Sequence, residues 1–138
     1  MSDEVEEFVS RFPRKPTPSN SPDDLFEIQH TGEWNYQIEG GGTKIFIDGY
    51  RYRTILEAKY VNNPERSPYI PNSQIPNFIR QKIVKQIRDE FRRLANVIKD
   101  PLTPFESLEV ITNHSEAKAL FEELLQEFNI VSDVVIRE

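Results

Sequence analysis

The chain has 138 residues, a formal net charge of −6, two histidines and no cysteine. This length suits one domain with a single core, and a hydrophobic content of 37% is too high for a fully disordered chain. The lack of cysteine excludes disulfides, thiolate zinc sites and a cysteine nucleophile. Two histidines leave little scope for a histidine-built site, so any metal would be held by oxygen atoms. Because no apolar run approaches the length of a membrane span and the first residues are acidic, we expect neither a transmembrane helix nor a signal peptide.

The charge is distributed unevenly along the chain. Residues 1–43 carry a net −6, residues 44–99 carry +7, and residues 100–138 carry −7. A local basic surface is what binding to a phosphate backbone requires, because the polyanion needs counter-charges. The alternative is that these basic residues only cover a solvated helix.

The first 22 residues are predicted to form an N-terminal helix and a proline-rich linker. Residues 3–12 place apolar side chains at helical spacing, and residues 13–22 contain four prolines. We therefore place the main domain at residues 23–138.

A second, short helix begins the main domain. Ser21 is a good N-cap, Pro22 suits the first helical position, and Gly32 ends the helix. This helix would bury the apolar side chains Leu25, Phe26 and Ile28 and could present Glu27.

Three strands are expected next, as a meander. Residues 34–38 alternate apolar and polar side chains, and the three glycines at 40–42 predict a hairpin turn. Residues 43–48 and 50–60 would form the second and third strands.

The ends of these last two strands carry the candidate chemistry. Asp48 closes one apolar run, and Glu57-Ala58-Lys59 closes the next; Glu57 and Lys59 point to the same face of a strand. Two carboxylates suit a hard cation such as Mg²⁺, and a lysine beside them can orient or activate water. On an exposed strand, however, the same acid-x-Lys pattern is usually only solvated charge.

The remaining chain alternates helices and strands. Residues 61–74 form a proline-containing loop in which Arg66 and Tyr69 are candidate substrate contacts. A long helix is predicted from residue 75 or 76 to residue 100, followed by a strand at 107–112, a helix to residue 128 and a strand at 130–136. One flank of the long helix holds Gln81, Lys85, Arg88 and Arg92, which could face either the active site or solvent.

This order and these motifs resemble the restriction-endonuclease-like PD-(D/E)xK nucleases. The segments "IDGY" and "ILEAKY" are similar to the "FDGF…LLEAKG.Y" signature of restriction-endonuclease-fold toxins. The segments "IQHTG" and "LEVITNHSEAKALFEELL" are similar to the flanks of the fifth class of those toxins, found in bacterial polymorphic toxin systems. The resemblance implies an α/β (α+β) fold with a mixed β-sheet of about four or five strands flanked by helices.

The resemblance also implies roles for individual residues. Asp48, Glu57 and the Ala58 carbonyl would bind Mg²⁺ or Mn²⁺, and Lys59 would position or activate the attacking water. Gln81 would be the polar helix residue that supports the site. A third acid is expected at Glu27, with Glu33 as the second choice. The candidate nucleic-acid contacts are the basic residues Arg51, Arg53, Arg66, Lys85, Arg88 and Arg92.

The sequence therefore predicts a metal-dependent endonuclease, a DNase toxin or effector domain that acts in the cytoplasm, in a target cell if it is delivered by a secreted toxin. Its partners would be DNA and a cognate immunity protein, without a membrane partner. Alternatives within the enzymes are an RNase toxin and a phage or repair nuclease. The alternative from another class is a non-catalytic acidic binding module, such as an immunity or adaptor protein.

Overall fold

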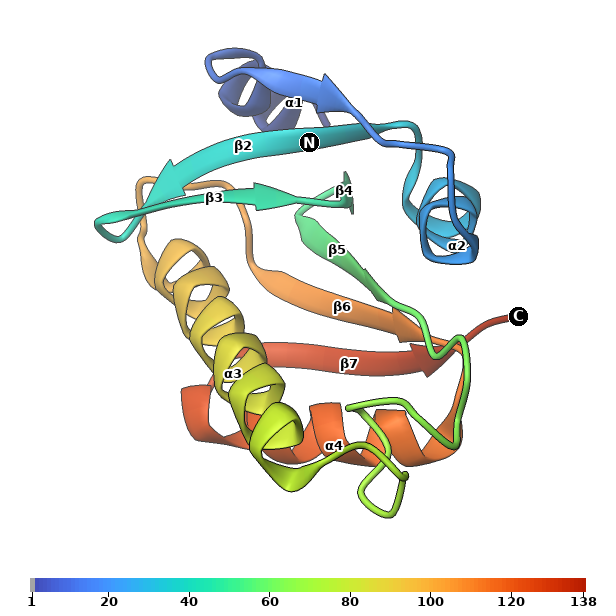
Figure 1. Cartoon of the computed structure of the whole chain (residues 1–138). Helices are drawn as coiled ribbons and strands as arrows, with labels where there is room; N and C mark the ends of the chain where they lie inside the picture. The colour runs from blue at the N-terminus through green and yellow to red at the C-terminus, as the bar shows by residue number, and fades with distance from the viewer. Residues whose placement is uncertain (1) are drawn as a thin grey trace.

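The computed structural model describes residues 2–138, which form two β-sheets and four α-helices (Figure 1). The helices are α1 (Ser2–Ser10), α2 (Pro22–Thr31), α3 (Asn77–Lys99) and α4 (Ser115–Leu125), and a 3₁₀ turn follows at Gln126–Phe128. The strands are β1 (Arg14–Pro16), β2 (Trp34–Gly40), β3 (Thr43–Ile47), β4 (Gly49–Arg51), β5 (Thr54–Lys59), β6 (Ser107–Thr112) and β7 (Val131–Ile136). Among these residues, no helix combines the length and the apolar character that crossing a membrane would need.

The larger sheet has the order β4-β5-β6-β7 and is mixed. β4 pairs antiparallel with β5, whereas β5, β6 and β7 are parallel and are connected through α3 and α4. Ile55, Leu108, Val110 and Val134 of its strands are buried, as expected for parallel strands covered by helices. A mixed sheet flanked by helices confirms the predicted fold class.

The smaller sheet has the order β1-β2-β3 and is antiparallel. The predicted three-stranded meander is therefore wrong, because β3 ends at Ile47 and the chain passes into the other sheet. Residues 50–60 are not one strand either. β4 pairs Arg51 with Thr54 of β5, so the residues between them, Tyr52 and Arg53, form a tight turn in which Tyr52 has a φ of 54°.

The N-terminal segment packs against the rest of the chain. Val5, Phe8 and Val9 of α1 are buried in the core, and β1 pairs with the first residues of β2. The predicted helix is present, but the predicted linker contributes a strand, because an extended proline-containing chain is tolerated at a sheet edge. Met1 lies outside the described residues.

α2 begins and ends where the sequence predicts. The Ser21 hydroxyl accepts a hydrogen bond from the Asp24 N–H (3.2 Å), and Gly32 follows the helix with a φ of 107°. Phe26 is buried, but Leu25 is 57% exposed, so the expectation that Leu25 is buried was wrong.

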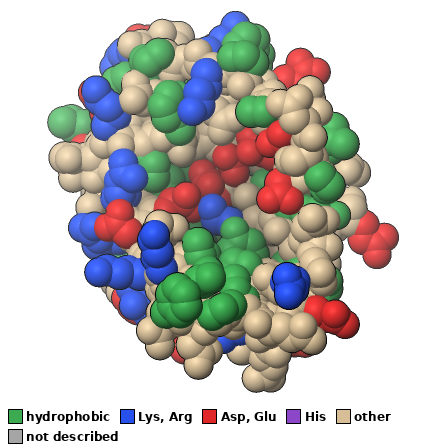
Figure 2. Space-filling model, viewed as in Figure 1, with side chains coloured by type: hydrophobic (Ala, Val, Ile, Leu, Met, Phe, Trp, Pro, Cys, Tyr) green, Lys and Arg blue, Asp and Glu red, His purple; other side chains and the backbone are tan. Residues whose placement is uncertain are grey.

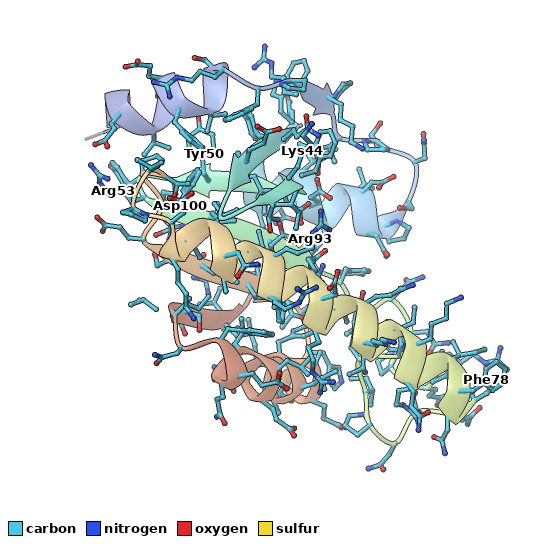
Figure 3. All side chains as sticks on the ribbon, turned by 90° about the vertical axis from the view of Figure 1, so that its left-hand side faces the viewer. Lys44, Tyr50, Arg53, Phe78, Arg93 and Asp100 are labelled. Atoms are coloured by element: carbon cyan, nitrogen blue, oxygen red, sulfur yellow. The ribbon has the colours of Figure 1, made fainter. Side chains whose placement is uncertain are left out.

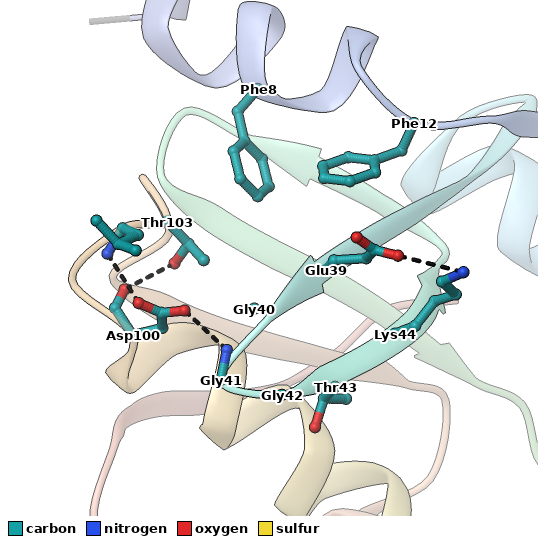
Figure 4. Close-up of a pocket in the computed structure, with 11 residues that line it drawn as sticks. Phe8, Phe12, Glu39, Gly40, Gly41, Gly42, Thr43, Lys44, Asp100 and Thr103 are labelled. Atoms are coloured by element: carbon teal, nitrogen blue, oxygen red, sulfur yellow. Dashed lines mark hydrogen bonds and ion pairs between the residues drawn. The ribbon is translucent and has the colours of Figure 1, made fainter.

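The β2–β3 hairpin is joined to the C-terminal end of α3. Gly41 and Gly42 form its turn with φ values of 55° and 76°, and the Gly41 N–H donates to the Asp100 carboxylate at 2.8 Å (Figure 4). A Cβ atom at Gly41 would lie 2.3 Å from the carbonyl oxygen of Asn96, whereas a Cβ atom at Gly42 would meet nothing within 4 Å. The hairpin can approach α3 this closely only because residue 41 has no side chain.

We expect Gly41→Ala to destabilise the fold more than Gly42→Ala. Both substitutions place a side chain at positive φ, which costs about 1–2 kcal/mol, but only the first also forces the hairpin away from Asn96. Urea unfolding monitored by circular dichroism measures the difference. Equal losses of stability in the two variants would show that the contact with α3 does not constrain the hairpin.

Candidate active site

Asp48 lies at the junction of the two sheets, between β3 and β4. Its carboxylate accepts a hydrogen bond from the Ala58 N–H at 2.8 Å, and its own N–H donates to a carboxylate oxygen of Glu57 at 3.4 Å. The β4–β5 register explains the contact, because Gly49 pairs with Leu56 and so brings the preceding residue beside Glu57. Asp48 and Glu57 therefore meet although they lie in different elements.

Glu57 and Lys59 lie on the same face of β5, as the alternation of a strand requires. The Lys59 ammonium is 3.8 Å from a carboxylate oxygen of Glu57 and 2.5 Å from a carboxylate oxygen of Glu90, on α3. The Glu57 and Lys59 side chains are only 4% and 13% exposed. This motif is therefore not the solvated charge that a bare acid-x-Lys pattern often represents.

Glu27 of α2 brings a further carboxylate to the site. Its side chain accepts hydrogen bonds from the Thr17 hydroxyl (3.1 Å) and from the Asn35 amide (2.9 Å). The approach of α2 depends on Gly49, because a Cβ atom there would lie 2.3 Å from the carbonyl oxygen of Thr31. Gly49 therefore helps to set the distance between α2 and the strands that carry Asp48 and Glu57.

These side chains line an open cavity of about 310 Å³. Figure 2 shows acidic side chains gathered in a hollow at the centre of one face of the molecule. The acidic lining is Asp23, Asp24, Glu27, Asp48, Glu57 and Glu90. Phe46, Tyr60 and Tyr69 add aromatic walls to the same cavity.

Burial of several carboxylates around one ammonium changes their proton affinities. Burial, reinforced by the negative charge of Glu27, raises the pKa of Asp48 from 3.8 to about 6. Burial and the charges of Asp48 and Glu90 raise the pKa of Glu57 well above 4.5. Burial lowers the pKa of Lys59, but the surrounding carboxylates, with Glu90 first, outweigh it and raise this pKa above 10.5. The site therefore holds more negative charge than Lys59 can neutralise.

The structure does not bring Gln81, Lys85, Arg88 and Arg92 to this cavity. They line a separate cavity of about 580 Å³ on α3 together with Phe128. Gln81 and Glu90 are nine positions apart, which is about two and a half helical turns, so they project from opposite sides of the helix. The expectation that Gln81 supports the site is wrong in this geometry, because the opposite flank of the apolar stripe faces the acids.

Four other predicted site residues also lie elsewhere. Arg51 pairs with Glu109 (3.0 Å), and Arg53 contacts Glu4 (2.5 Å) and the Pro104 carbonyl (3.1 Å), because the turn at Tyr52 separates both from the end of β5. Arg66 is exposed in the loop before α3, and Glu33 is exposed after α2. Of the predicted acids, Glu27 rather than Glu33 lines the cavity.

Sequence reasoning missed Glu90 and Asn35. Glu90 follows the core residue Ile87 by three positions. Helical spacing therefore puts it beside the apolar stripe that packs inward, and this is the signal that could have identified it. Asn35 alternates with Trp34 and Tyr36 on β2 and received no role, although its amide links Glu27 to Thr17. The missing information was which flank of α3 and which face of β2 meet β5.

The donor atoms suit a hard divalent cation, because they are carboxylate oxygens with an excess of negative charge. Within the described residues, no three His, Asp or Glu side chains converge closely enough to hold a metal by themselves. The Asp48 and Glu57 carboxylates, which meet in the cavity, fit part of the coordination shell of such a cation.

The raised pKa values of the acids predict how the metal-free protein responds to pH. Folded protein binds more protons than unfolded protein above pH 4, so the free energy of unfolding decreases as pH rises through about 6. The raised pKa of Asp48 contributes on the order of 2–3 kcal/mol to this decrease in the free energy of unfolding. We expect the melting temperature in EDTA to fall from pH 5 to pH 8, and Glu57→Gln to flatten this fall. Glu33→Gln, at an exposed carboxylate outside the cavity, is the control; an equal slope in all three proteins would contradict the prediction.

Comparison with known proteins assigns the fold to a family. The family model described as restriction endonuclease fold toxin 2 matches residues 22–131, which include strands β2 to β6 and all the cavity acids. Searches among curated proteins and among solved structures gave no significant match. The resemblance to restriction-endonuclease-fold toxins is confirmed, although the matched class is the second where the motifs suggested the fifth. The chain belongs to the restriction endonuclease fold toxin 2 family.

Proposed function

We propose that this protein is a metal-dependent endonuclease that hydrolyses the phosphodiester bonds of DNA as a bacterial toxin or effector domain. The observation that supports this most directly is the meeting of Asp48, Glu57 and Lys59 in one acid-rich cavity. Membership of the toxin family supports nuclease chemistry. RNA is the alternative substrate, because the same groups could act on either backbone.

The residues at the ends of β3 and β5 have separate roles in this proposal. Asp48 and Glu57 bind Mg²⁺ or Mn²⁺ with the Ala58 carbonyl. Bound metal supplies positive charge that stabilises the phosphate as it is attacked. Lys59 remains protonated at neutral pH, so it positions the attacking water and the phosphate through N–H donors rather than removing a proton.

Glu90 and Glu27 orient these groups. The Glu90 carboxylate holds the Lys59 ammonium from the α3 side. Glu27 is itself fixed by Asn35 and Thr17, so it is a rigid third acid at the edge of the site. In this role its carboxylate does not bind the metal directly. It orients a water molecule at the edge of the cavity.

A toxin that cleaves DNA endangers the cell that makes it. We therefore include a cognate immunity protein and a target-cell cytoplasm in the proposal, on the strength of the family. An acidic binding module explains the site less well, because burying carboxylates with raised pKa values costs stability that a binding surface has no reason to lose.

Plasmid cleavage tests the proposal. The purified protein should degrade plasmid DNA with Mg²⁺ or Mn²⁺ and not in EDTA. We expect Glu57→Ala and Lys59→Ala each to reduce the rate by at least about 10²-fold, because each removes a group that acts on the reacting phosphate or water. Glu33→Ala is the matched control and should cut normally. A folded protein that cleaves neither DNA nor RNA with either metal would refute the function.

Glu90 and Gln81 provide a second test, of which side of α3 supports the site. Glu90→Gln removes the charge that holds Lys59, so we expect cleavage to fall about 10-fold or more. Gln81→Ala should leave the rate unchanged, because this residue lines the other cavity. The opposite result would restore the assignment of Gln81 to the site.

A further inference from the structure

The acidic cavity opens onto the face of the smaller sheet that carries Phe46. Along β3, Ile45 and Ile47 point into the core, so Phe46 points to the other face, the one that Asp48 continues. Phe46 lines the cavity with Asp48 and is 37% exposed. An exposed aromatic ring therefore lies beside the carboxylates of the site.

Basic side chains accompany this ring. The Lys15 ammonium, on β1, lies over one face of the Phe46 ring, 4.3 Å from its centre, so the other face is the one a base could cover. Among the side chains described, those of residues 4–138, Lys15 forms no ion pair. On the α3 side, the Arg93 guanidinium donates to the Lys44 carbonyl, and Figure 3 shows these two residues close together. Cations from β1 and α3 thus flank the strand that carries Phe46.

We propose that Phe46 is a stacking platform for a base of the DNA strand being cut, next to the scissile phosphate, while Lys15 and Arg93 bind the neighbouring phosphates. This inference rests on the proposed function. An aromatic ring with adjacent cations is the usual combination for single-stranded nucleic acid, because every base has a π face and every phosphate a charge. Negative phosphates also need local cations to approach a cavity lined by six acids.

Stacking on Phe46 restricts the form of the substrate. A base that leaves its own stack to cover a protein ring cannot remain paired, so the nucleotide beside the cut must be unpaired. The protein should therefore prefer single-stranded or frayed DNA over intact duplex.

The separate cavity on α3, which Gln81, Lys85, Arg88 and Arg92 line, is a weaker candidate for binding the DNA strand. Arg88 already pairs with Glu127 (2.9 Å) and Arg92 with Asp89, so both cations have carboxylate partners on the protein itself. This cavity also lies on the opposite side of α3 to Glu90. A strand held there would not place a phosphate between Asp48 and Glu57.

Binding of labelled oligonucleotides in EDTA tests stacking without cleavage. We would measure fluorescence anisotropy with single-stranded DNA 12-mers that carry one abasic site at each position in turn. Phe46→Leu should weaken binding of the intact oligonucleotide about 10-fold, and Phe46→Trp should restore it. The loss in Phe46→Leu should vanish when the abasic site occupies the stacked position. Phe78→Leu, at a 73% exposed ring at the far end of α3, is the matched control and should bind normally (Figure 3).

The phosphate contacts have their own measurement. Lys15→Ala should weaken binding and make the slope of log affinity against log salt concentration shallower by about 0.7, the change for one lost contact on a single strand. Lys99→Ala, at the exposed end of α3, should change neither quantity.

The outcomes separate this inference from the proposed function. Equal affinity of wild type and Phe46→Leu, or a loss that is independent of the abasic position, overturns the stacking role, as does tighter binding to duplex than to single strand. Undetectable binding by the wild type also overturns it. The expected binding pattern without metal-dependent cleavage would instead overturn the nuclease proposal and leave the base platform in place.

Discussion

Two hydrogen bonds at Asp48 hold the junction between the two sheets, and the rest of the site depends on this junction. Its carboxylate accepts from Ala58 and its N–H donates to Glu57, so the end of β3 is fastened to the end of β5 although the two strands belong to different sheets. A change of sheet normally leaves backbone groups without ladder partners. Here two side chains supply such partners, Asp48 for the Ala58 N–H and Glu57 for the Asp48 N–H, so the same contacts close the fold and bring two carboxylates together.

This junction lowers the stability of the fold, because it buries like charges. Lys59 offsets part of the repulsion, and its own position is fixed by Glu90 from α3, so three elements must pack correctly before the charges balance. Raised pKa values of Asp48 and Glu57 show that the balance is incomplete. Such a burial of like charges makes physical sense where a cation or a substrate completes the balance.

The sequence predicted the local features and missed those that depend on packing. Ser21, Gly32, the glycine turn and the facing of Glu57 and Lys59 follow from capping, φ preference and strand alternation, which act over a few residues. Arg51 and Arg53 were misplaced because residues 50–60 were predicted as one strand, whereas the positive φ of Tyr52 starts a turn. Gln81 was predicted and Glu90 was missed, although both flank the same apolar stripe. Only the docking of α3 on β5 decides which flank faces the acids.

The net charge of a sequence segment did not predict which charges surround the cavity. The +7 block of residues 44–99 suggested a basic surface around Asp48, yet Arg51, Arg88 and Arg92 of that block pair with nearby acids. Exposed charges are screened beyond roughly 8 Å at physiological ionic strength, so net charge along the sequence says little about the field at one cavity. What a phosphate would meet there is set by neighbouring side chains. Lys15, from the acidic N-terminal block, instead contacts the ring of Phe46, which lines the cavity.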